Sequence, residues 1–330
     1  MWFEQLFGFA ERSWAETRVR FGVEGETLRS RVNQRQFAIG RFDTPSLASL
    51  RAASATGPRG RIRYTHTVIG DVLGLHAQPD NAGAMFQVAS QFNCLEFPGP
   101  ATTPEDGVTG YAHDPTQGPA CSLAAAAATV YRNYFAPCRG GSGQERGRQL
   151  NTVEGLQEQL GEPVFTVRNG YTSGTSSSLA RLAVLAAGRP REQLLESIRI
   201  GVQSRAGVTF TSRWKEPTEP SHVSQAFCSA VSCGYVHDVP LDRWEPLATL
   251  VLDAAYEATL HAAALDLAQG RGSGRVWLTF VGGGVFGNRR EWIAGAIRRA
   301  LQRAEALPLD VHIAHYRSID PEMRRLVESA

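Results

Sequence analysis

Residues 276–316 read VWLTFVGGGVFGNRREWIAGAIRRALQRAEALPLDVHIAHY, and this stretch decides the fold. The apolar residues 276–281 predict a buried strand, the glycines at 282–287 a loop, residues 290–304 a helix, and residues 310–316 a last strand. Apolar strands that alternate with helices are typical of a sheet covered by helices. We therefore expect an α/β layered fold.

The rest of the sequence repeats this alternation. Strand candidates share β-branched, aromatic or uncharged apolar residues, and they lie at 61–76, 84–92, 207–211 and 222–235. Helix candidates share alanine-rich or amphipathic patterns, and they lie at 122–135, 177–187, 190–198 and 242–269. The length of 330 residues favours one enlarged domain at 61–330. An N-terminal extension at 1–60 precedes it and ends at residues 57–60, where glycine and proline favour a loop.

Composition excludes several classes of protein. The formal net charge is only +2, so we expect no nucleic-acid partner. The sequence has no run of 18 apolar residues, and its opening MWFEQLFGFAERSWAE lacks the features of a signal peptide. We therefore expect a cytoplasmic protein without a membrane span. The five cysteines have neither a disulfide framework nor the close pairing of a zinc site, so we expect no metal.

The glycine loop predicts an anion site. Glycines let the backbone approach an anion, and a following helix adds its dipole, so a phosphate or diphosphate fits there. Asn288 is placed to cap that helix, with Glu291 at the third helical position. The loop also fits a dinucleotide-binding fingerprint, but only one strand follows it and no acidic residue ends that strand. A plain strand-to-helix turn is the other alternative.

Two polar side chains lie near the ends of predicted strands, at the edge where ligands bind in α/β sheets. Asp71 can accept a hydrogen bond from the exocyclic amine of adenine, or it can cap local N–H groups in a turn. Asn93 can bond ribose hydroxyls, or it can form an Asx turn. Spacing alone leaves both alternatives open.

The segment 97–119, FPGPATTPEDGVTGYAHDPTQGP, is a third candidate. It carries Glu105, Asp106 and Asp114 among glycines and prolines, and loops of this length are usually functional or disordered. Two carboxylates beside a sugar suggest glycosidic hydrolysis, in which one of them orients water. A solvated acidic loop is the alternative.

Together these segments resemble the macrodomain superfamily. The order is IGDV (69–72), QVASQFNCLEF (87–97), the loop 103–119 and GGGVFGN (282–288). GVTGYAHDPTQGPAC, RNGYT (168–172) and the WEP…LVLDAAYEATL run resemble the MavL-type bacterial-effector branch, which removes ADP-ribose from arginine. The Asn-Ala-Ala-Asn run of other members is absent. The resemblance implies a three-layer macrodomain-like fold with a mixed central sheet and helices on both faces.

The resemblance also implies roles for single residues. Asp106 and Asp114 match the carboxylate pair of the branch, and Glu96 is a further catalytic candidate. The implied ADP-ribose contacts run along the whole cleft: Asp71 and Val72 at adenine, Asn93 and Gln117 at the distal ribose, and Gly282, Gly283, Gly284, Val285, Phe286, Gly287 and Asn288 at the diphosphate.

The implied function is hydrolysis of the N-glycosidic bond between ADP-ribose and protein arginine, with ubiquitin among the implied substrates. No cofactor is required, and ADP-ribose is the ligand and product. A non-catalytic ADP-ribose reader is the alternative, and a nicotinamide-dependent oxidoreductase that uses the glycine loop is a third hypothesis.

Overall fold

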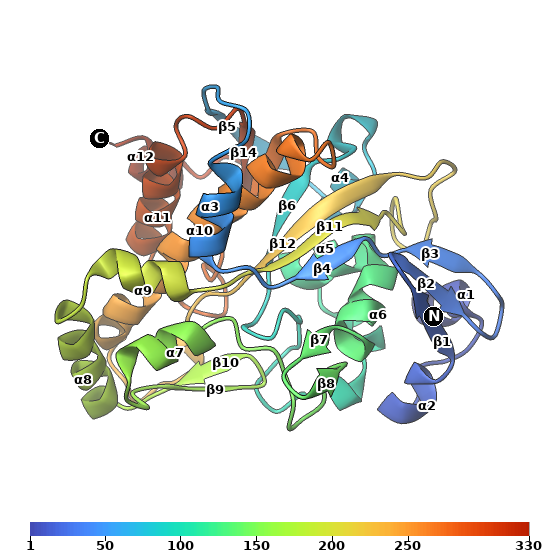
Figure 1. Ribbon diagram of the computed structural model, residues 1–330, viewed down its shortest axis with the longest axis horizontal. Coiled ribbons are helices and arrows are strands. Elements are labelled where there is room, and N and C mark those ends of the chain that lie inside the picture. The colour runs from blue at the N-terminus through green and yellow to red at the C-terminus, as the bar shows by residue number, and fades with distance from the viewer. Residues whose placement is uncertain (330) are drawn as a thin grey trace.

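A seven-stranded mixed sheet runs through the computed structural model, which describes residues 1–329 (Figure 1). Its strand order is β4 (Arg41–Asp43), β11 (Gly201–Gly207), β12 (His222–Cys228), β6 (Met85–Ala89), β13 (Arg275–Leu278), β14 (Asp310–Tyr316) and β5 (Arg63–Ile69). The pairs β4–β11 and β11–β12 are antiparallel, and every pair from β12 to β5 is parallel. The carboxyl ends of the parallel strands therefore meet at one edge.

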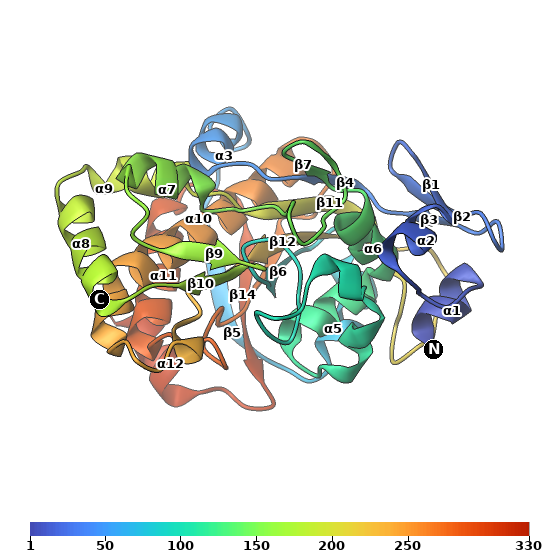
Figure 2. The same cartoon turned by 90° about the horizontal axis from the view of Figure 1, so that it is seen from below.

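Helices cover both faces of this sheet (Figure 2). One face carries α3 (Leu47–Ser54), α10 (Glu245–Ala268), α11 (Arg290–Arg303) and α12 (Pro321–Glu328), and the other carries α4 (Val72–His76), α5 (Gln117–Ala124) and α6 (Ala126–Tyr134). Strand β6 shows the division, because Met85 packs in the cluster of α10 while Phe86 packs in a cluster with α4. The predicted α/β fold of three layers with a mixed central sheet is confirmed.

The remaining elements surround this frame. At the N-terminus lie α1 (Trp2–Phe7), α2 (Trp14–Arg18) and a small antiparallel sheet of β1 (Phe21–Glu24), β2 (Thr27–Ser30) and β3 (Gln36–Ala38). Elsewhere lie β7 (Pro137–Cys138), β8 (Gly141–Ser142), α7 (Glu154–Leu160), β9 (Thr166–Arg168), β10 (Tyr171–Ser173), α8 (Ser176–Ala187) and α9 (Arg191–Ser197). Short 3-10 helices are η1 (Pro79–Asn81), η2 (Pro104–Asp106), η3 (Thr109–His113), η4 (Cys233–Tyr235) and η5 (Leu241–Trp244).

Part of the predicted N-terminal extension, residues 1–60, belongs to the main layers of the fold. In residues 1–38, Phe3, Phe7 and Phe21 meet edge to face, and they pack in one apolar cluster with residues of α5, α6 and the segment 95–111. Residues 41–54 instead supply the edge strand β4 and helix α3, which packs on α10. The boundary of the N-terminal extension therefore stays a prediction.

Several local predictions need correction. The strand expected at 61–76 ends at Ile69, because Val72–His76 form α4, and the strand expected at 222–235 ends at Cys228. The strand expected at 207–211 lies at Gly201–Gly207, because Thr209 leaves the sheet and donates its N–H to Ala124 O at 2.7 Å. The helix expected at 122–135 is broken at Ala125, whose φ and ψ are −122° and 56°. Asn288 does not cap α11, which begins after Arg289 without a side-chain cap.

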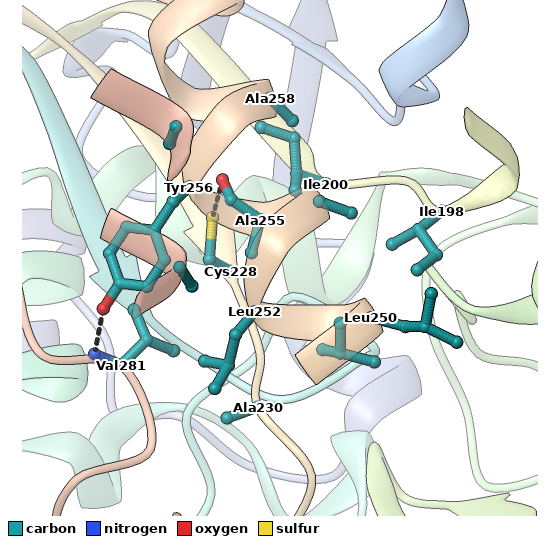
Figure 3. Close-up of a cluster of buried hydrophobic side chains, with 14 of the residues drawn as sticks. Ile198, Ile200, Cys228, Ala230, Leu250, Leu252, Ala255, Tyr256, Ala258 and Val281 are labelled. Carbon is teal, nitrogen blue, oxygen red and sulfur yellow. Dashed lines mark hydrogen bonds between the residues drawn. The ribbon is translucent and has the colours of Figure 1, made fainter. Parts of the chain in front are cut away.

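Helix α10 fixes the strand that leads into the glycine loop (Figure 3). The hydroxyl of the buried Tyr256 donates to Thr279 O at 2.7 Å and accepts the N–H of Val281 at 3.0 Å. Around it Leu250, Leu252 and Ala255 pack with residues of β12 in one apolar cluster. The loop therefore starts from a rigid point at the end of β13.

Within residues 1–329, no helix combines the length and apolar character that crossing a bilayer would need.

Candidate functional site

A cleft of about 350 Å³ lies at the carboxyl ends of β6, β12 and β13. Four segments line it: Ala89–Gln91, Glu96–Pro98, Asp114 with Thr116–Pro119, and Thr279–Gly282 with Gly284–Phe286. Single residues from other elements complete the lining, namely Tyr171, Ala230 and Tyr235. The predicted residues Glu96, Asp114 and Gln117 thus face the glycine loop across one cavity.

Glu96 is a buried carboxyl at the base of the cleft. Its Oε2 accepts from Ser122 Oγ at 2.8 Å and lies 3.4 Å from Arg132 Nη2, while its Oε1 has no partner within residues 1–329. Burial raises the pKa of Glu96 to about 7, although Arg132 and Ser122 oppose the shift. A carboxyl that titrates near neutrality can both donate and accept a proton.

Asp114 follows η3 and is half-buried at the mouth of the same cleft. Its Oδ1 accepts the N–H of Thr116 at 2.9 Å, and its own N–H donates to Tyr111 O at 3.2 Å. These two bonds fix the direction of the carboxylate and leave Oδ2 without a hydrogen bond inside the described chain. Asp114 therefore has one oxygen for a ligand or a water molecule.

The glycine loop presents main-chain donors. Gly283 N–H, Gly287 N–H and Asn288 N–H bond within the loop, to Phe280 O, Gly284 O and Gly282 O. The N–H groups of Gly284, Val285 and Phe286 have no acceptor within the described chain. An alanine Cβ at Gly284 would meet no atom within 4 Å, so the backbone there borders open space. Such an array of N–H groups is suited to an anion.

An aromatic group closes one end of the cleft. Tyr171, Tyr235 and Phe286 have ring centroids 5.0 to 5.8 Å apart. Gly234 N–H donates to Phe286 O at 2.9 Å, and a Cβ at Gly234 would lie 2.3 Å from Val285 O. Sequence reasoning gave no role to Tyr171 or Tyr235, although RNGYT (168–172) was one of the segments that carried the resemblance.

Two predicted residues do not line the cleft. Asn93 is fully buried, and its amide donates to Gln149 Oε1 at 2.8 Å and accepts the N–H of Leu95 at 3.1 Å, as in the Asx-turn alternative. Asp106 Oδ2 accepts the N–H and the hydroxyl of Thr103 in a capping box. Asp106 therefore does not line the cleft with Asp114, and its carboxylate instead holds the first turn of η2.

Three more predicted residues have local partners. Gln117 lines the cleft, but its amide bonds Ala89 N and Gln87 O, both at 2.8 Å. Asp71 is exposed and caps α4 by accepting the N–H of Leu73 at 3.0 Å, while Val72 packs in an apolar cluster. Neither Asp71 nor Val72 lines the cleft, so their roles at adenine stay predictions.

Asn288 holds the loop instead of the helix. Its Nδ2 donates to Val231 O at 2.7 Å, in the segment that follows β12. Gly282 has a φ of 78°, and a Cβ there would lie 2.4 Å from that of Ala230. The loop and the segment after β12 are thus packed as one wall.

No group of three or more His, Cys, Asp or Glu side chains within residues 1–329 has the arrangement to hold a metal ion.

Comparisons with known proteins give structural likeness only. No family model and no curated protein matches the sequence. A poly(ADP-ribose) glycohydrolase from Deinococcus radiodurans, in complex with ADP-ribose, has a TM-score of 0.49, is 16% identical, and the match covers 88% of this chain and 94% of that one. For the enzyme from Thermomonospora curvata the TM-score is 0.39 and the identity 15%, over 95% and 94%. Identities at this level do not place the chain in a family.

Proposed function

We propose that the chain binds ADP-ribose in this cleft and hydrolyses the N-glycosidic bond that joins it to protein arginine. The observation that carries the proposal is the pairing of two walls. The wall of Glu96 and Asp114 offers carboxyl groups, and the wall of Gly284–Phe286 offers three N–H groups without acceptors. A diphosphate on the second wall would present its ribose to the first.

The chemistry needs a group that releases a proton and a group that accepts one. The oxygen of water bonds to the anomeric carbon of the ribose while the bond from that carbon to the guanidine nitrogen breaks. Asp114, through its unpaired oxygen, takes the proton from water. Glu96, protonated because burial raises its pKa to about 7, gives its proton to the departing nitrogen. Exchange with solvent then restores both groups.

The arginine linkage and a protein substrate, ubiquitin included, rest on the sequence resemblance. The similar solved proteins are glycohydrolases of poly(ADP-ribose) by name. The experiment must therefore determine which linkage to ADP-ribose this chain hydrolyses. Release of ADP-ribose should be measured from arginine-modified protein, from protein modified on a carboxyl group, and from poly(ADP-ribose). Release from the arginine-modified protein alone is the expected result.

Asp114→Asn provides the test of mechanism. We expect hydrolysis to fall about 10²-fold or more, since a base that takes the proton from water typically contributes that much. Binding of free ADP-ribose, measured by calorimetry, should stay at the wild-type level. Thr116→Ala is the matched control, because it alters the same turn and keeps the carboxylate. Unchanged hydrolysis in Asp114→Asn would remove the assigned role.

A non-catalytic reader is the second candidate. The ion pair of Glu96 with Arg132 favours it, because a carboxylate held by arginine is a poor proton donor. The same measurements separate the two functions. Tight binding of ADP-ribose without release from any of the three substrates would indicate a reader.

A further inference from the structure

A second hollow lies beside the cleft and belongs to none of the roles above. Its volume is about 450 Å³. It lies between the start of the loop that leads to Asp114 and the β9–β10 hairpin, and its lining residues are Ala101, Thr103, Arg146, Gly147, Gln149, Leu150, Asn151 and Val167–Gly170. Two of its lining segments, Ala101–Thr103 and Val167–Gly170, are close in sequence to Pro98 and Tyr171, which line the candidate active site.

A thin wall separates the two cavities. Tyr171 and Pro98 line the cleft, whereas Gly170 and Ala101, their near neighbours in sequence, line the hollow. Tyr171 Oη donates to Phe97 O at 2.6 Å, and Asn169 Nδ2 donates to Pro100 O at 2.8 Å. A group bound near Asp114 thus has the hollow as its neighbour on the Tyr171 side.

The wall is rigid. Asn169 and Gly170 form the turn of the β9–β10 hairpin with φ angles of 49° and 78°. A Cβ at Gly170 would lie 2.4 Å from that of Gln91, so only glycine fits between the two cavities. Gln149 donates to Asn169 Oδ1 at 2.7 Å and accepts a hydrogen bond from the buried Asn93. The side-chain amides of Asn93 and Gln149 therefore help to fix the turn that lines the hollow.

The charge of the hollow is positive. Arg146 and Arg168 line it, and no acidic residue does. Arg168 is exposed and has no ion pair or side-chain hydrogen bond within residues 1–329. In the same part of the chain, the one ion-pair partner of Arg146 is Glu105, whose Oε2 lies 3.7 Å from Arg146 Nε. Guanidinium groups recognise carboxylates through paired N–H donors, so two of them in one concavity favour an acidic ligand.

We propose that this hollow is a specificity subsite that binds acidic side chains of the acceptor polypeptide, next to the modified arginine. The inference rests on the proposed function and adds the sequence context of the substrate. An arginine flanked by Asp or Glu places those carboxylates against Arg146 and Arg168 while the ADP-ribose occupies the cleft. A flanking Lys meets like charge there and is disfavoured.

The test uses two ADP-ribosylated arginine peptides that differ only in their flanking residues, Asp in one and Lys in the other. With the wild-type chain, kcat/KM for release of ADP-ribose should be about five- to tenfold higher for the Asp peptide, the range expected for exposed ion pairs. In the double variant Arg146→Glu/Arg168→Glu the preference should reverse. Raising the salt concentration should shrink the preference in both proteins.

Arg59→Glu/Arg61→Glu is the matched control. Both side chains are exposed and form no hydrogen bond or ion pair within residues 1–329, and they precede β5 at the amino ends of the parallel strands, opposite the cleft. This double variant changes the net charge equally and should keep the wild-type preference for the Asp peptide. A preference that also reversed here would show long-range attraction and would overturn the subsite.

The outcomes separate this inference from the proposed function. Equal release from both peptides by the wild-type chain leaves arginine hydrolysis standing and overturns the subsite. Release from neither peptide, with release from another ADP-ribosylated substrate, overturns the arginine linkage and the subsite with it. Binding of free ADP-ribose should be the same in all three proteins, which shows that the variants still fold.

Discussion

The two walls of the cleft are held in place by different means. The segment 103–113, which leads to Asp114, is held by residues about 100 positions away: Glu11 accepts the N–H groups of Val108 and Thr109, and Trp2 Nε1 donates to Thr109 O at 3.1 Å. The glycine loop bonds mainly to itself and to its own strand, with further support from Tyr256, Gly234 and Asn288.

This difference coincides with a difference in chemistry. The wall held from a distance carries carboxyl groups, whose position and protonation depend on burial by other parts of the chain. The wall held locally carries main-chain N–H groups, whose direction depends on loop geometry. We therefore expect changes at the first wall to affect turnover and changes at the second to affect binding.

Glu96→Gln should show the largest effect on the first wall. Without a proton to donate, hydrolysis should fall about 10²-fold or more, while ADP-ribose affinity stays unchanged. The wild-type rate should fall as pH rises through about 7, because only protonated Glu96 donates, and this step should be absent from the variant. A step near pH 7 that persisted in Glu96→Gln would belong to another group.

The same substitution changes the pH dependence of stability. The pKa of Glu96 is raised from 4.5 to about 7 in the folded chain, so the folded state binds this proton more tightly than the unfolded state. Its contribution to stability is complete below pH 4.5 and is lost as pH rises to about 7. Glu96→Gln should remove this loss, which denaturant unfolding at pH 5 and pH 8 would measure.

Glu11→Ala should loosen the first wall from outside. The substitution leaves three donors without their acceptor: Val108 N at 2.9 Å, Thr109 N at 2.6 Å and Tyr134 Oη at 2.7 Å. The free energy of unfolding should fall by about 2–4 kcal/mol. Hydrolysis should fall more than ADP-ribose affinity, since the segment next to Asp114 loses its support.

Glu24→Ala is the control for Glu11→Ala. Glu24 is an exposed glutamate of the same N-terminal region, and no hydrogen bond or ion pair of its side chain is found within residues 1–329. Its loss should change stability by less than about 0.5 kcal/mol. If Glu11→Ala behaved like Glu24→Ala, the claim that a distant segment holds this wall would be wrong.

The same contrast explains what could be predicted from the sequence. The strand–glycine loop–helix unit of residues 276–304 is local, so apolar runs and glycines predict it with the correct order and direction. The contacts of Glu11, and the aromatic pair Tyr171 and Tyr235, join segments that no local pattern links. The polar residues Asn93, Gln117 and Asp106 had the chemistry of ligand groups, but their side chains bond other groups of the chain. Asn93 and Gln117 bond residues distant in the sequence, whereas Asp106 bonds Thr103 in a local capping box.

Two neighbouring glycines test the second wall. Gly282→Ala would place a Cβ 2.4 Å from Ala230 at a φ of 78°, so it should lower the free energy of unfolding by about 2–4 kcal/mol. Gly284→Ala meets no atom within 4 Å and should keep stability within about 0.5 kcal/mol. Its methyl group would instead border the N–H groups without acceptors, so ADP-ribose affinity should fall about tenfold, roughly the loss of one hydrogen bond to a charged group. Wild-type affinity in Gly284→Ala would show that the ligand does not lie on this loop.

Asn288→Ala should give the smallest effect, because the second wall has several supports. The substitution removes the bond from Asn288 Nδ2 to Val231 O at 2.7 Å and leaves that buried carbonyl with only the weak thiol donor of Cys233, which should cost about 1–2 kcal/mol. Tyr256 and Gly234 still hold the two ends of the loop, so ADP-ribose affinity should fall only a fewfold and hydrolysis in proportion. Asn288→Asp, which keeps the size but cannot donate to the carbonyl, should lose at least as much stability as Asn288→Ala. If either variant abolished turnover while ADP-ribose still bound, the glycine loop would take part in the reaction itself, and the division between a binding wall and a reacting wall would fail.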